Sequence, residues 1–90
     1  MDMTITPVPK EHIVSTEFDG EGVIVDLNAK HYYQLNETAM FVWQRLEKGQ
    51  AVGEIIAAMT EVYDISSEQA TESVERLLSE MKSYKLIQPS

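Results

Sequence analysis

The stretch HYYQLNETAMFVWQRL, residues 31–46, contains the change of pattern that decides the fold. Its first five residues are rich in strand-forming side chains, and alternation along a strand places Tyr33 and Leu35 on one face. Tyr32 and Gln34 fall on the opposite face. We therefore expect one tyrosine to belong to the core and the other to be at least partly exposed to solvent.

From Asn36 onward the period of the same stretch becomes helical. Asn36 is a favourable N-cap residue, and Glu37 suits the first turn because its charge complements the helix dipole. Apolar residues then recur at helical spacing, with Trp43 on the apolar stripe. We expect Gly49 to close the helix as its C′ residue. The sequence predicts a strand that leads directly into a helix, with Trp43 packed in the core.

Upstream of this stretch, the sequence predicts two further strands. His12–Phe18 is rich in β-branched residues, and the turn Asp19–Gly22 contains an Asp-Gly pair of the kind found in hairpins. Val23–Leu27 follows as the second strand, and Asn28–Lys30 is a short turn before the third, His31–Leu35. We expect an antiparallel meander with the second strand in the middle and an exposed edge on each side.

Downstream, the pattern predicts two more helices. Val52–Tyr63 is short, and Ser66 with Gln69 forms a capping box that opens a longer helix ending near Lys85. The apolar stripe of the longer helix consists of Ala70, Val74, Leu77, Leu78 and Met81. The predicted fold class is α+β: a three-stranded antiparallel sheet followed by three helices, in a winged helix-turn-helix-like arrangement.

Length and composition restrict the organisation and the partners. Residues 12–88 form one predicted domain, and residues 1–11, with Pro7 and Pro9, read as a flexible N-terminal segment without the apolar run of a signal peptide. No apolar stretch is long enough to span a membrane. The formal net charge of −8 disfavours nucleic acid as a partner, and the absence of cysteine is compatible with a cytoplasmic location.

Candidate catalytic residues are few. His12 and His31 lie in different predicted strands without metal-ligand spacing, and the carboxylates are mostly expected on solvated surfaces. Asp26 is the exception, since it alternates with apolar residues in a strand. No phosphate-binding loop or hydrolase motif is present. We expect no enzymatic activity, no metal site and no cofactor.

The order and spacing of these elements resemble the PqqD-like proteins, which recognise leader peptides during the biosynthesis of ribosomally synthesised, post-translationally modified peptides. The resemblance covers residues 12–87. It is carried by Gly22–Asp26, Tyr33–Asn36, Ala39, Trp43, Leu46, Gly49, Val52–Ile55 and the helix from Ser66 to Leu86. The pattern is closer to lasso-peptide and generic members than to the protein of pyrroloquinoline quinone biosynthesis.

The resemblance implies a peptide chaperone that binds the leader of a precursor peptide as an added strand. It also implies partners, namely a leader peptidase, a cyclase or a radical enzyme of the same pathway. The binding site is expected between the third strand and the third helix. The implied residues are the backbone of His31, Tyr32, Tyr33 and Gln34, the side chains of Leu78, Met81, Lys82 and Lys85, and polar contacts from Glu75 and Arg76.

The residues themselves agree with this mode of binding, because an edge strand offers unpaired backbone groups to an extended peptide. Two alternatives stay open. The helical order also permits a winged-helix DNA-binding protein, although Val52–Tyr63 holds two glutamates and no Lys or Arg. A dimerisation or subunit-docking domain would use the same strand edge to pair with another chain.

Overall fold

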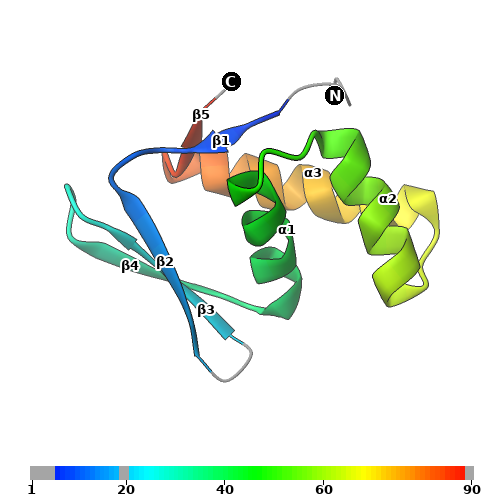
Figure 1. The fold of residues 1–90 in the computed structure, drawn as a ribbon, viewed down its shortest axis with the longest axis horizontal. Helices are drawn as coiled ribbons and strands as arrows, with labels where there is room; N and C mark the ends of the chain where they lie inside the picture. The colour runs from blue at the N-terminus through cyan, green and yellow to red at the C-terminus, as the bar shows by residue number, and fades with distance from the viewer. Residues whose placement is uncertain (1–5, 19–20, 89–90) are drawn as a thin grey trace.

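The computed structural model describes residues 6–18 and 21–88 of the 90-residue chain. A three-stranded sheet packs against a layer of helices, and a short two-stranded ladder joins the two ends of the described chain (Figure 1). The elements in chain order are β1 (Val8–Pro9), β2 (Ile13–Phe18), β3 (Glu21–Asp26), β4 (His31–Leu35), α1 (Glu37–Glu47), α2 (Val52–Tyr63), α3 (Ser67–Ser83) and β5 (Ile87–Gln88).

The main sheet is the predicted antiparallel meander, with β3 between β2 and β4. Ile24 pairs with Ser15 on one side and Tyr33 on the other, and its side chain is fully buried. The turn was predicted to extend to Gly22, but Glu21 and Gly22 already belong to β3 and pair within the sheet. Residues 19–20 lie outside the described part of the chain.

The capping residues predicted the starts of α1 and α3 and the end of α1. The side-chain oxygen of Asn36 accepts a hydrogen bond from the backbone N–H of Ala39 at 2.8 Å. Gly49, just after α1, has a φ of 80°, which a residue without Cβ adopts easily. Ser66 and Gln69 form the predicted capping box of α3. Helix α3 ends at Ser83, slightly before the predicted end near Lys85.

The core lies between the inner face of the sheet and the three helices. Trp43 of α1 is fully buried, as predicted from its position on the apolar stripe. Tyr33 and Leu35 of β4 pack against this core, whereas Tyr32 is 75% exposed. The period-2 assignment of the β4 faces is therefore confirmed. The three strands of the main sheet, followed by three helices, confirm the predicted α+β class.

The β1–β5 ladder was not predicted. Val8 pairs with Gln88 and Pro9 with Ile87, and the backbone N–H of Lys10 donates to the carbonyl of Leu86 at 3.1 Å. The segment 1–11, expected to be flexible, thus includes a hydrogen-bonded strand at its C-terminal end. Residues 1–5 lie outside the described part of the chain. This ladder attaches the N-terminal strand to the segment that follows α3, away from β4.

None of the helices in residues 6–18 and 21–88 combines the length and apolar character needed to cross a bilayer.

Gly22 provides a test of the contact between the sheet and α1. A methyl group added at Gly22 would collide with the Sδ of Met40 and lie 2.9 Å from its Cγ. We expect Gly22→Ala to lower the free energy of unfolding by about 1–3 kcal/mol, because an overpacked core must shift its neighbours. Urea denaturation measures the loss.

Met40→Ala removes the colliding side chain and gives the control. Gly22→Ala should cost less in the Met40→Ala background than in the native protein, which a double-mutant cycle detects. Simple additivity of the two changes would contradict a direct contact between these positions.

Candidate functional site

Strand β4 forms one edge of the main sheet. It pairs with β3 along one side, and no strand within residues 6–18 and 21–88 pairs with its other side. An edge strand presents backbone N–H and C=O groups on its open side, and these groups can pair with another extended chain. The N-terminal strand does not cover this edge, because β1 pairs with β5 instead. The β4 edge is therefore open within the described structure.

A groove with a volume of about 350 Å³ lies beside this edge. Residues 32–35 of β4 line one side of it, and Leu86 and the start of α1 complete it. The other side consists of Leu77, Glu80 and Met81 of α3 and Tyr84, the residue that caps the helix. We call this feature the β4–α3 groove.

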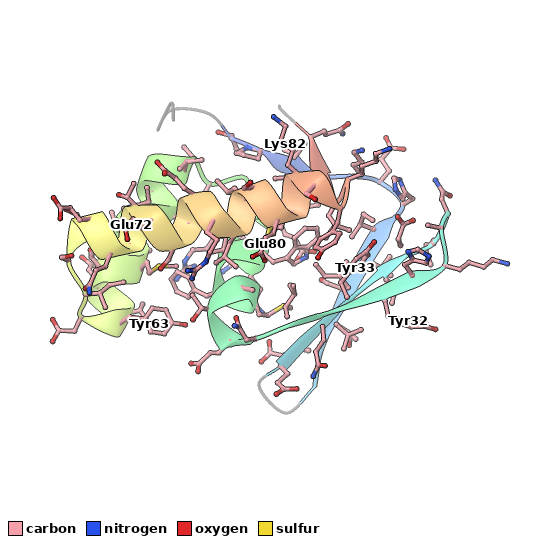
Figure 2. All side chains as sticks on the ribbon, turned by 180° about the vertical axis from the view of Figure 1, so that it is seen from behind. Tyr32, Tyr33, Tyr63, Glu72, Glu80 and Lys82 are labelled. Carbon is pink, nitrogen blue, oxygen red and sulfur yellow. The ribbon has the colours of Figure 1, made fainter. Side chains whose placement is uncertain are left out.

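Two tyrosines bridge the sides of the β4–α3 groove. The rings of Tyr33 on β4 and Tyr84 after α3 lie with their centroids 5.0 Å apart, tilted by 39°. Figure 2 shows Tyr33 beneath the C-terminal half of α3, on the same side of the helix as Glu80. The groove therefore combines apolar and aromatic surface with one open backbone edge. A strand edge for backbone pairing, with a groove beside it for side chains, is an arrangement by which extended peptides are bound.

Leu77, and not Leu78, forms the apolar wall. Leu78 belongs to the core and does not line the groove, whereas Leu77 is half-buried and lines it. Met81 is also a core residue, only 3% exposed, but it lines the groove as well. Sequence reasoning placed both residues on one stripe and named Leu78 for the site. The spacing of Leu77, Met81 and Tyr84, at i, i+4 and i+7, places all three on a single helix face and would have identified the wall.

The structure brings together some of the predicted site residues and separates others. Tyr32, Tyr33, Gln34 and Met81 line the β4–α3 groove, and His31 lies at the start of the same strand. The charged residues of the predicted site do not line the groove; they are Glu75, Arg76, Lys82 and Lys85. Figure 2 shows Lys82 on the opposite side of α3 from Glu80. Glu80, Leu77 and Tyr84 were missing from the prediction.

Asp26 has a structural environment that does not suit acid–base chemistry. Its side chain accepts hydrogen bonds from the backbone N–H groups of Ala29 and Asn28, both at 3.0 Å, within the turn before β4. The bond from Ala29 lowers the pKa of Asp26 below its ordinary value of 3.8, against the raising effect of burial. His12 Nε2 lies 3.6 Å from the same carboxylate. Asp26 thus stays ionised and holds the turn.

In the described part of the chain, no group of three or more His, Cys, Asp or Glu side chains converges.

The family model described as coenzyme PQQ synthesis protein D (PqqD) matches residues 21–87, which run from β3 to the first residue of β5. The chain belongs to the PqqD family. Among curated proteins, none matches the sequence of this PqqD-family member.

Two solved structures share the fold of this PqqD-family protein. One is described as TbiB1 in complex with the TbiA(beta) leader peptide; it has a TM-score of 0.86 and 22% identity, and the match covers 90% of this chain and 94% of that one. The other is a lasso peptide synthetase B1 complexed with the leader peptide, with a TM-score of 0.85, 24% identity and coverage of 93% and 99%. At this level of identity the likeness establishes a common fold.

The different environments of Leu77 and Leu78 predict different costs of truncation in this PqqD-family protein. Leu78→Ala should lower the free energy of unfolding by about 2–4 kcal/mol, because it leaves a cavity in the core. Leu77→Ala should cost only about 1 kcal/mol, since less apolar surface is removed from contact. Chemical denaturation of the two variants compares them, and a larger loss for Leu77→Ala would reverse the assignment of the two helix faces.

The lowered pKa of Asp26 predicts that the stability of the fold depends on pH. Because the folded-state pKa lies below 3.8, the carboxylate contributes stability that is complete above this value and is lost as the pH falls through the folded-state pKa. Asp26→Asn should therefore be less stable than the native protein at neutral pH, and the difference should shrink in acid.

Urea denaturation across an acidic pH series measures this difference. Glu61→Gln, the same charge change on the exposed surface of α2, is the control and should give no such convergence. A difference between Asp26→Asn and the native protein that persists unchanged at low pH would contradict the role given to the ionised carboxylate.

Proposed function

We propose that this PqqD-family protein binds the leader of a ribosomally synthesised precursor peptide as an additional strand along β4, and presents it to a modifying enzyme without catalysing a reaction itself. The observation that carries this proposal is the open edge of β4 next to the β4–α3 groove. The edge supplies backbone pairing and the groove receives side chains. The names of the two solved structures, both leader-peptide complexes on the same fold, support the same ligand class.

The energetics assign distinct roles to the strand edge and the groove. Micromolar binding requires about 8 kcal/mol. Four or five backbone hydrogen bonds contribute only about 1 kcal/mol each, and ordering a flexible peptide offsets part of that gain. Apolar side chains, at about 1.5–3 kcal/mol for each one fully buried, must supply much of the affinity and most of the selectivity. Leu77 and Tyr84 provide the surface that such anchors need, and Met81, although only 3% exposed, also lines the groove.

The proposed site combines the sequence expectation with the groove. It keeps the backbone of His31–Gln34 and the side chain of Met81. It replaces Leu78 by Leu77 and adds Tyr84, because these residues line the groove. Glu75, Arg76, Lys82 and Lys85 are placed outside it. A lasso-peptide leader is the preferred ligand, and a leader peptidase, a cyclase or a radical enzyme in the cytoplasm would receive it.

A DNA-binding role is less compatible with the helices. The helix of a winged-helix protein that enters the DNA groove needs basic side chains for the phosphates. Helix α2 carries Glu54 and Glu61 and no Lys or Arg, and the following helix α3 carries four glutamates against only two basic residues, Arg76 and Lys82. The whole chain has a net charge of −8. A gel-shift assay at low salt would overturn this ranking if it showed strong binding to duplex DNA.

Titration of isotope-labelled protein with a synthetic leader tests the proposal. The probe is the leader of a precursor encoded beside this gene. Binding should shift the amide signals of His31–Leu35 and those of Leu77, Glu80 and Tyr84, because these residues border the added strand. A leader that saturates the protein without moving these signals would place the site elsewhere.

Variants separate groove contacts from general effects on the surface. Leu77→Asp should weaken leader binding by about tenfold or more, because a charge replaces an apolar anchor. Val62→Asp is the matched control: Val62 on α2 is exposed and lies outside the groove, and this change should leave the affinity unaltered. Circular dichroism confirms that both variants fold.

Concentration-dependent light scattering tests whether β4 instead pairs with a second copy of the chain, which would block binding of the leader.

A further inference from the structure

Glu80 stands apart from the rest of the β4–α3 groove. It is the only charged residue among those that line it, and its neighbours on the same helix face are Leu77, Met81 and Tyr84. Within residues 6–18 and 21–88, the one contact with the geometry of an ion pair lies between His12 and Asp26, so no described cation lies within ion-pair distance of Glu80. Lys82 follows two residues later but projects from the opposite side of α3 (Figure 2). A carboxylate without a partner therefore borders an apolar and aromatic surface.

Strand addition would direct side chains of the peptide toward this carboxylate. Side chains alternate across a sheet, and the inner face of β4 is the face that carries Tyr33 and Leu35 into the groove. A peptide paired with β4 continues the sheet, so every second side chain points to the same inner face. The first groups that these side chains meet are the tyrosine pair of Tyr33 and Tyr84 and the acidic α3 residue Glu80.

The chemistry of this corner favours a long cationic side chain. The methylene stem of Lys or Arg can lie along apolar surface while its charged end reaches the carboxylate. Tyrosine rings attract cations through their faces, in addition to the ion pair. An apolar side chain would leave the carboxylate partly desolvated without a partner, and an acidic side chain would be repelled.

We infer that Glu80 makes the β4–α3 groove selective for a peptide strand with a Lys or Arg side chain on the face that meets α3. This inference rests on the proposed function, because it specifies the chemistry of the ligand at the same site. The acidic character of the whole protein attracts cationic peptides at long range as well. A test must therefore separate one local carboxylate from the net charge of −8.

Selection from a displayed library of random peptides of about ten residues, roughly the length of a long strand, provides that test. The targets are the native protein, Glu80→Gln and Glu72→Gln. Glu72 lies in the N-terminal half of α3, is exposed and does not line the groove (Figure 2), so its variant has the same net charge as Glu80→Gln. The native protein and Glu72→Gln should select peptides with Lys or Arg at one fixed position. Glu80→Gln should lose this preference.

Titration with one selected peptide gives the magnitude. Replacing its Lys or Arg by norleucine should weaken binding to the native protein about fivefold, a value at the upper end for an exposed ion pair. The same replacement should have little effect on Glu80→Gln, because the two changes remove one interaction.

Three results would overturn the inference, and they are distinguishable. Selected peptides that shift the amides of residues 31–35 but show no difference between Glu80→Gln and the native protein would leave peptide binding intact and remove the role of Glu80. Equal loss of the cation preference in Glu72→Gln would attribute that preference to overall charge. Failure to select any peptide that engages residues 31–35 would overturn the proposed function together with the inference.

Discussion

The open backbone edge of β4 is the constraint on which the rest of the candidate site depends. A strand in the middle of a sheet has all its backbone groups paired, and side chains alone would then have to bind a peptide. β4 is paired only with β3 in the described structure, so its second row of N–H and C=O groups is available. These groups recognise any extended chain, whatever its sequence. Under the proposed function, discrimination between peptides therefore comes from the surface beside the strand, which α3 supplies.

The core determines where that surface lies. Ile24 in the middle strand and Trp43 in α1 are fully buried and hold the first helix against the inner face of the sheet. Leu78 and Met81 of α3 belong to the same core, which places the C-terminal half of α3 beside β4. Leu86 is buried, lines the groove and accepts a hydrogen bond at its carbonyl from the backbone N–H of Lys10. The wall of the groove is therefore attached to the core at both the helix and the segment that follows it.

Local signals in the sequence predicted much of this fold. Asn36, Gly49 and the pair Ser66–Gln69 marked helix boundaries because capping depends on a few neighbouring residues. The faces of β4 followed from alternation alone. Pairing of β1 with β5 was missed because two strands of two residues each carry no periodic pattern and lie far apart in the sequence.

The groove wall was only partly predictable, for a related reason. Leu77 and Leu78 are both apolar and adjacent, and helical rotation separates them by about 100°. Only the packing of α3 against the other helices and the sheet decides which of the two becomes core.

The β1–β5 ladder also determines how this domain can be joined to other proteins. Val8 lies opposite Gln88, so the two ends of the described chain leave the fold side by side, and Figure 2 shows the ladder on the far side of α3 from β4. Domains with adjacent ends tolerate insertion into a host loop and circular permutation. This architecture is thus suited to genetic fusion through either end, or through both, while the opposite surface keeps its access to solvent.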